Sequence, residues 1–143
     1  MKNMDVLIDT NVILDTVQER EPFCSDAKQI LACCIRNTIS GFVSAHSLCD
    51  IFYILRKDMS VSERLSLIGR LCKYLTVISE QHNDFEAIAG DKGTKDLEDS
   101  LQMVCAKNYQ LKYIVTRNIK DFENAEVTAI EPKEFLGLLD ANS

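Results

Sequence analysis

Short apolar runs alternate along this chain with longer stretches in which apolar residues recur every three or four positions. The short runs predict buried strands and the longer stretches predict helices. The predicted strands are 6–8, 39–43, 76–78, 113–115 and 127–130. Because short strands alternate with helices, the pattern predicts βαβ units, and therefore an α/β fold with a mainly parallel sheet of four to five strands covered on both faces.

Capping residues set the expected helix boundaries. Thr10 and Asn11 are good N-cap types for a helix through 12–14, and Pro22 is expected in the first turn of the next helix. Ser60 and Glu63 have the spacing of a capping box. The apolar residues of the helix that follows are expected to form its inner face, namely Leu65, Ile68, Leu71, Cys72 and Leu75.

The length and composition indicate one globular unit. At 143 residues, the chain is expected to form a single domain, 1–143, that buries about two-thirds of the surface of the unfolded chain. An apolar fraction of 46% argues against disorder. The net charge of −6 is unfavourable for general nucleic-acid binding, although bound divalent cations would cancel part of it locally.

The cysteines and histidines do not suggest a zinc site. The six cysteines contain no Cys-x-x-Cys pair, and there are only two histidines, His46 and His82, which are expected to be ordinary surface or partly buried residues. The cysteines fall among apolar helical positions, so we expect them to pack as small hydrophobic side chains. No signal peptide or membrane span is recognisable, and the expected location is the reducing cytoplasm.

Four aspartates lie at or after the ends of apolar runs, although they are far apart in sequence. Asp9 follows the first predicted strand, Asp50 comes shortly after the second, Asp99 begins a helix, and Asp121 follows the fourth strand. In an open parallel sheet, the loops at the carboxyl ends of the strands converge on one crevice. Carboxylates gathered there repel one another unless a cation neutralises them, and oxygen ligands suit Mg²⁺ or Mn²⁺. The pattern predicts a metal-dependent enzyme acting on phosphates.

Several polar residues are expected to support these acids. Thr116 is suited to orient a carboxylate or a water, Asn118 offers a neutral oxygen ligand, and Arg117 and Lys120 supply positive charge for phosphate oxygens. The remaining supporting residues stand at the starts of predicted helices, namely Thr10, Asn11 and Ser44. A purely structural interpretation stays open, in which Asp9 caps a helix and 116–118 form a capped turn.

Four segments resemble the PIN domain family, in the family's order. They are 7–15, 42–51, 96–102 and 113–122, and the last contains the run Thr-Arg-Asn-x-Lys-Asp-Phe at 116–122. The resemblance implies a three-layer α/β/α sandwich and an Mg²⁺- or Mn²⁺-dependent ribonuclease that hydrolyses RNA with a metal-activated water. Many small VapC-like members are toxins that commonly form homodimers and are blocked by an antitoxin protein.

The resemblance also assigns positions. Asp9 matches the family's first metal-binding aspartate, Asp99 the acid that opens the later helix, and Asp121 the last acidic region. The chain departs from many members at Asn118, where they carry an aspartate, and at Asp50, where they carry a glutamate.

These departures leave a second hypothesis open, a catalytically weak or inactive PIN-fold module that acts through protein or RNA binding. A third hypothesis, a phosphohydrolase with an aspartyl nucleophile, is weaker. Such enzymes typically have Asp-x-Asp after the first strand, whereas this chain has Asn11 at the second aspartate's place.

Overall fold

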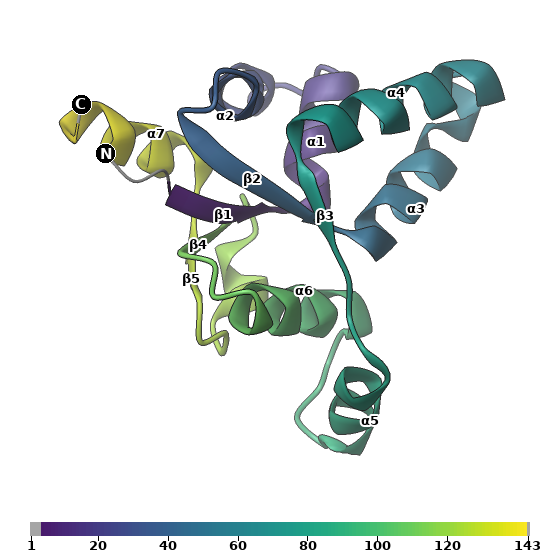
Figure 1. Ribbon diagram of the computed structural model, residues 1–143, viewed down its shortest axis with the longest axis vertical. Coiled ribbons are helices and arrows are strands. Elements are labelled where there is room, and N and C mark those ends of the chain that lie inside the picture. Colours follow the sequence, from purple (N-terminus) through teal and green to yellow (C-terminus); the bar gives the residue numbers. More distant parts are fainter. Residues whose placement is uncertain (1–3, 143) are drawn as a thin grey trace.

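The computed structural model describes residues 4–142, and within them five strands form one parallel sheet (Figure 1). The strand order is β3-β2-β1-β4-β5. The strands are β1 (Met4–Ile8), β2 (Ile39–Ser44), β3 (Thr76–Ile78), β4 (Tyr113–Val115) and β5 (Thr128–Ile130). All five predicted strands are present, with shifts of one or two residues at some of their ends.

Strand β1 lies at the centre of the sheet and is covered on both faces. Val6, Leu7 and Ile8 are completely buried, as a continuous apolar run in a parallel sheet predicts. Because successive side chains of a strand point to opposite faces, Val6 and Ile8 enter the larger hydrophobic core and Leu7 enters the smaller one. Each core is closed by a layer of helices.

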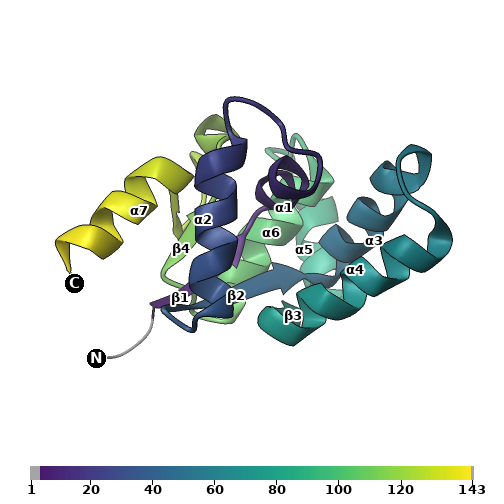
Figure 2. The same ribbon diagram turned by 90° about the horizontal axis from the view of Figure 1, so that it is seen from above.

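Helices form a layer on each face of the sheet (Figures 1 and 2). The larger core is covered by α1 (Thr10–Val17), α2 (Cys24–Ile35), α4 (Val61–Tyr74) and α7 (Pro132–Ala141). The smaller core is covered by α6 (Leu97–Asn108) and the 3₁₀ helix η2 (Ile119–Phe122), and α5 (His82–Gly90) packs beside α6. Helix α3 (Ala45–Ile54) leads into a second 3₁₀ helix, η1 (Leu55–Lys57). The expected three-layer α/β/α sandwich is confirmed.

Two predicted helix starts differ from the structure. The N-cap of α1 is Asp9, and Thr10 and Asn11 lie in the first turn of the helix. Helix α2 begins only at Cys24, so Pro22 lies in the turn before it. The capping box at Ser60 is confirmed, because Ser60 Oγ accepts from the Glu63 amide and Glu63 accepts from the Ser60 amide.

The inner face of α4 was predicted partly wrongly. Leu71 and Leu75 are buried, but Leu65 is 58% exposed and Cys72 is also exposed. The face is instead completed by Leu67 and Arg64. Arg64 tolerates burial because its guanidinium donates to the Phe52 carbonyl at 2.8 Å and lies 4.2 Å from the Phe52 ring centroid. Because Arg64 is part of the buried face of α4, the apolar residues alone did not locate that face.

The cysteine prediction holds for four of the six residues. All six are free thiols, and the four buried ones are Cys24, Cys33, Cys34 and Cys105. Cys49 and Cys72 are exposed on α3 and α4, so their helical positions did not make them core residues. Over residues 4–142 no helix combines the length and the apolar character needed to cross a membrane.

Gly41 in β2 provides a test of how tightly α2 and α4 pack onto the sheet. A methyl group there would lie 2.6 Å from Cys34 Sγ and 2.7 Å from Leu75 Cδ2. Gly41→Ala should therefore lower the free energy of unfolding by about 1–3 kcal/mol, the usual cost of overpacking. Urea unfolding at neutral pH measures it.

Gly69→Ala in α4 is the matched control, because a methyl group there meets no atom within 4 Å. It should raise the free energy of unfolding by about 0.5–1 kcal/mol, the gain expected in a helix interior. Equal effects of the two substitutions would contradict the close packing at Gly41.

Candidate active site

The candidate site starts at Asp9, at the carboxyl end of the central strand. The Asp9 amide still bonds to the Val115 carbonyl at 3.0 Å, and the residue then becomes the N-cap of α1. Its carboxylate is 4% exposed and does not cap the helix. Oδ2 accepts from Thr116 Oγ1 at 2.8 Å, and Oδ1 accepts from Gln102 Nε2 at 3.0 Å. The end of β4 and the face of α6 thus fix both oxygens of this acid.

The surroundings of Asp9 act on its charge in opposite directions. Burial raises the pKa of the carboxyl above its ordinary value, because a charged group loses its hydration. The bonds from Gln102 and Thr116, a bond from the Thr10 amide and the positive charge of Arg117 lower the same pKa. Burial is the larger effect, so the pKa of Asp9 lies above its ordinary value, and water screens the charge of its carboxylate poorly.

Asp99 is the second acid and stands in the first turn of α6. The helix begins at Leu97, two residues earlier than predicted, and its N-cap Asp96 accepts from the Asp99 amide at 2.9 Å. Burial, and then the negative charges of Asp96, Asp121 and Asp9, raise the pKa of Asp99 to about 6. Asp99 and Asp121 both line a polar cleft of about 490 Å³ between the loop before α6 and η2. Asp121 itself is exposed.

Asp50 joins this group through Glu98, a residue that the sequence analysis did not select. Burial, the charge of Asp50, a hydrogen bond with the Asp50 side chain and the charges of Asp9 and Asp96 raise the pKa of Glu98 to about 7. A helical-face argument would have found Glu98, because it lies four residues before Gln102. Glu98 and Asp99 therefore link all four predicted acids electrostatically.

Thr116 contacts Asp9 directly, whereas Asn118 acts on Asp9 only through Thr116. Thr116 is completely buried and orients the Asp9 carboxylate, one of the two roles expected for it. The Asn118 amide donates to Thr116 Oγ1 at 3.0 Å and so holds that hydroxyl in place. The Asn118 side chain stands at the N-cap of η2 and has no side-chain capping bond.

Arg117 is not directed at the acid cluster as a phosphate ligand. Its Nε and Nη2 bond to Asp15 at 2.8 and 3.3 Å, and its guanidinium lies 4.2 Å from the Phe23 ring centroid. Asp15 is buried and is also paired with Arg20 at 3.6 Å. Arg117 therefore ties the end of β4 to α1, and its charge reaches Asp9 only through space.

The three remaining supporting residues differ in their contacts. Thr10 Oγ1 donates to Ser47 Oγ at 2.7 Å, and Ser47 Oγ bonds to Ser44 Oγ at 2.8 Å. These buried hydroxyls join the starts of α1 and α3. Asn11 is half-buried, and its side chain makes no hydrogen bond within residues 4–142.

His46 has a more defined setting than an ordinary surface histidine. Its Nδ1 lies 2.6 Å from Glu80 Oε1, and the same oxygen accepts from Cys105 Sγ at 3.5 Å. His82 fits the expectation, with an exposed contact to Glu86 at 3.1 Å. The His46–Glu80 bond connects the start of α3, which carries Asp50, to the segment before α5.

The donors of this site suit a hard divalent cation in kind and in charge. Asp9, Asp99, Glu98 and Asp50 supply only carboxylate oxygens. Burial first, and then the negative charges of neighbouring acids, raise the pKa values of Glu98 and Asp99, whereas burial alone raises the pKa of Asp9. Gln102 Oε1 beside Asp9 is a buried oxygen without a hydrogen-bond donor. Within residues 4–142, no three His, Cys, Asp or Glu side chains form a closed set of ligands. The chemistry fits Mg²⁺ or Mn²⁺, although the carboxylates do not form a preassembled cage.

Comparisons with known proteins agree with this arrangement. The model of the PIN domain family matches residues 5–120. Ribonuclease VapC1 of Aquifex aeolicus (strain VF5) is 30% identical over 139 residues, which cover 94% of this chain and 95% of that protein.

Solved structures show the same fold at lower identity. A toxin–antitoxin complex from Klebsiella pneumoniae superposes with a TM-score of 0.66 at 19% identity, covering 89% of this chain and 97% of that one. VapBC-1 from nontypeable Haemophilus influenzae gives a TM-score of 0.66 at 13% identity, covering 91% and 99%. The match over residues 5–120 and the full-length relative establish that the chain belongs to the PIN domain family.

Proposed function

We propose that this protein is an Mg²⁺- or Mn²⁺-dependent endoribonuclease that acts as the toxin of a toxin–antitoxin pair. The observation that carries the proposal is the buried Asp9 carboxylate, fixed at both oxygens by Gln102 and Thr116 and coupled electrostatically to Glu98 and Asp99. Burial, and then repulsion from neighbouring acids, disfavours the charged forms of Glu98 and Asp99, and a bound cation would offset both effects. The full-length similarity to Ribonuclease VapC1 supports RNA as the substrate.

A bound divalent cation would supply charge neutralisation and a water of lowered pKa for phosphodiester hydrolysis. Asp9, Asp99, Glu98 and Asp50 would hold it. The chain's other residues prepare these acids. Thr116 and Gln102 hold Asp9 in one orientation, and the Asn118 amide fixes Thr116. Hydrogen bonds of this kind to a metal-binding side chain orient it and limit its motion.

The two departures from the family pattern have a physical compensation. Asp50 is one methylene shorter than glutamate, but Glu98 on α6 bonds to its side chain and adds a longer carboxylate. Asn118 leaves one charge fewer after β4, while Asp121 lines the same cleft as Asp99. These contacts favour the active enzyme over the inactive module.

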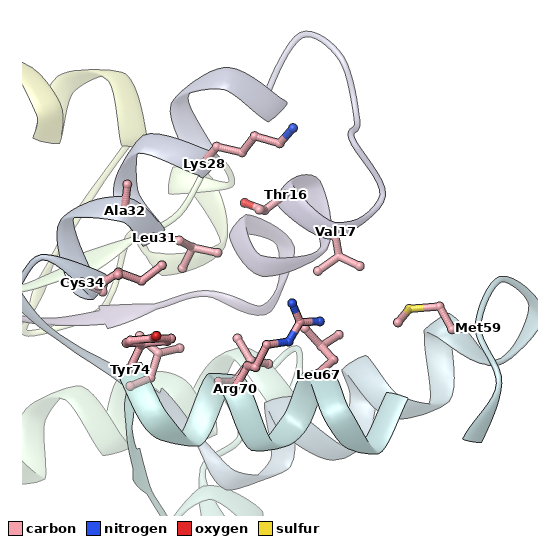
Figure 3. A pocket seen from close by; sticks show the side chains of 13 residues that line it. Thr16, Val17, Lys28, Leu31, Ala32, Cys34, Met59, Leu67, Arg70 and Tyr74 are labelled. Atoms are coloured by element: carbon pink, nitrogen blue, oxygen red, sulfur yellow. The ribbon is translucent and has the colours of Figure 1, made fainter. Parts of the chain in front are cut away.

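A second groove, on the opposite face of the sheet from α6, supports the antitoxin part of the proposal (Figure 3). It lies between α4 and the pair α1 and α2, and has a volume of about 480 Å³. Its apolar lining includes Val17, Leu31 and Leu67, and its charged residues are Lys28 and Arg70. In Figure 3, Arg70 points from α4 toward Thr16 and Val17.

This groove contrasts with the acidic protein around it. No carboxylate lines it, although the chain carries a net charge of −6, and Arg70 has no ion pair within residues 4–142. Lys28 lies 3.9 Å from Glu19, so Arg70 is the groove's cation without an ion pair among the described residues. An apolar groove with such a cationic rim is complementary to an amphipathic segment that carries acidic residues. We propose that an antitoxin contributes this segment, as the toxin–antitoxin complex of similar fold suggests.

The homodimer stays a prediction. In the apolar segment 51–55, Ile51 and Leu55 are core residues, whereas Tyr53 is 62% exposed and Ile54 is also exposed. The exposed pair is therefore the part of that segment available to a second copy.

The nuclease proposal is tested by three matched substitutions. Thr116→Val removes the residue that orients Asp9 and should reduce metal-dependent RNA cleavage by roughly 10- to 100-fold. Asp9→Asn removes the proposed metal ligand itself and should reduce cleavage by more than that. Asp5→Asn, at the exposed start of the same strand, should leave cleavage unchanged. The measurement is cleavage of mixed RNAs in Mg²⁺ or Mn²⁺ against EDTA, with Mn²⁺ affinity measured by calorimetry.

Full cleavage by Asp9→Asn would remove this acid from the site. Absence of both cleavage and Mn²⁺ binding in the wild type would favour the inactive module.

Acid repulsion should also appear in stability. Folded Asp99 and Glu98 have pKa values of about 6 and about 7, above their ordinary values of 3.8 and 4.5. The folded state therefore binds more protons, and the contribution of these groups to the free energy of unfolding falls as pH rises from about 4 to about 7. Urea unfolding in EDTA at pH 5 and pH 7.5 should show a smaller fall for Glu98→Gln than for the wild type.

Mg²⁺ binds the deprotonated acids, so it should restore stability at pH 7.5 much more than at pH 5. An identical pH dependence for wild type and Glu98→Gln would show that Glu98 is not under this repulsion.

The groove is tested by charge reversal. Co-expression with the product of the reading frame beside its own should yield a complex, and Arg70→Glu should raise its dissociation constant at least about tenfold by opposing an acidic segment. Lys73→Glu, on the same helix but outside the groove, is the control. Equal weakening by both variants would contradict docking at the groove.

A further inference from the structure

The polar cleft beside Asp99 does not end at the acids but continues along α6. A second hollow of about 280 Å³ shares five residues with it, namely Asp91, Thr94, Ser100, Met103 and Asn124. We call the two together the α6 groove, with an inner part that contains Asp99 and Asp121 and an outer part that contains Ile88 and Val104. Its combined size falls within the range of small-ligand pockets.

The α6 groove changes character along its length. Met103 is the only apolar side chain of the inner part, whereas the outer part adds Ile88, Val104 and Ala125. The far end is closed by Lys107 and Glu126, whose side chains pair at 3.3 Å. A molecule that starts at the acids and follows the groove thus passes from a charged to a partly apolar environment.

Polar groups without internal partners line the same groove. The side chains of Ser100 and Asn124 make no hydrogen bond within residues 4–142, and Thr94 Oγ1 donates to the Ile88 carbonyl at 3.2 Å but keeps its acceptor capacity. A hydroxyl and a primary amide at the wall of a cleft offer both donors and acceptors. This is the chemistry that reads the edge of a planar base.

The charges of the inner part argue against RNA binding through backbone phosphates alone. Two lysines, Lys95 and Lys120, line it without ion pairs in the described part of the chain. Five carboxylates line the same part, namely Asp91, Asp96, Asp99, Asp121 and Glu123. A phosphate would therefore be repelled unless cations occupy the acids and the lysines contact the neighbouring phosphates. Affinity must come substantially from another part of the nucleotide.

We propose that the α6 groove binds a single unpaired nucleotide of the RNA next to the bond that is cleaved. Met103 packs against the base, since a thioether makes favourable contacts with an aromatic ring. Asn124, Ser100 and Thr94 bond to the base edge, and Lys95 and Lys120 contact the flanking phosphates. The proposal rests on the nuclease function and adds to it a base-binding subsite along α6, which an unpaired base is free to enter.

The test uses ligands that cannot be cleaved. The four ribonucleoside 5′-monophosphates are titrated into ¹⁵N-labelled protein with Mg²⁺, and amide shifts are followed by NMR, with inorganic phosphate as a parallel ligand. Saturable shifts at Thr94, Ser100, Met103 and Asn124 with at least one nucleotide, but not with phosphate, are expected. Shifts that phosphate reproduces, or no shifts in the groove, would overturn the proposal.

Variants extend the test to RNA. Asn124→Ala, at an exposed position, and Met103→Ala should each raise the KM for single-stranded RNA at least about fivefold with little change in kcat. Lys120→Gln should reduce the slope of log affinity against log salt by about 0.7, the value for one phosphate contact to a single strand. Lys112→Gln, exposed outside the groove, is the control.

The two proposals fail separately. Metal-dependent RNA cleavage with an unchanged KM in both Asn124→Ala and Met103→Ala would keep the nuclease and remove the nucleotide groove. Nucleotide binding at these residues without any RNA cleavage would support the groove and remove the nuclease.

Discussion

The charge of Asp9 at the carboxyl end of β1 is the constraint on which the candidate site depends. An acid this deeply buried requires partners for both oxygens, since an unsatisfied buried charge is strongly unfavourable. The partners come from β4 and α6, through Thr116 and Gln102. Those bonds also fix where α6 lies against the sheet, and α6 carries Glu98 and Asp99. Satisfying one carboxylate therefore brings the others close.

Bringing them close creates a conflict that the protein alone does not resolve. Burial and the nearby acids raise the pKa values of Glu98 and Asp99, whereas Arg117, whose charge acts on Asp9, is committed to Asp15. Had Arg117 turned toward the acids, it would have neutralised them and left little reason to bind a cation. Its pairing with Asp15 lets it strengthen the frame while the acids keep their excess negative charge. On the proposed function, the local cost in stability would be offset when a cation binds, and functional sites commonly depart from optimal stability in this way.

The sequence predicted the elements well because their signals are local. Apolar runs of three to five residues located all five strands, and the order of the four family segments indicated the sheet. It did less well where one residue's environment comes from distant elements. Arg64 is buried only because Phe52 offers a carbonyl and a ring. Arg117 was expected to contact phosphate, but it pairs with Asp15. The two residues are 102 positions apart, so no local pattern predicts their contact. Glu98 was passed over in favour of Asp99, since their adjacent positions differ only in which face of α6 they occupy.

The two grooves lie on opposite faces of the sheet, and on the proposed function this limits how an antitoxin would block the acids. The cation-rimmed groove is formed by α1, α2 and α4, whereas the carboxylate cleft lies against α6 and η2. A segment that only filled the first groove would leave Asp99 and Asp121 open to RNA. Because Asp9 is the N-cap of α1, a chain that continued past the start of α1 would reach the carboxyl ends of the strands. On the proposed function, an antitoxin would therefore need an anchor on one face and an extension around that edge, and the acids that it would cover favour a cationic side chain at its end.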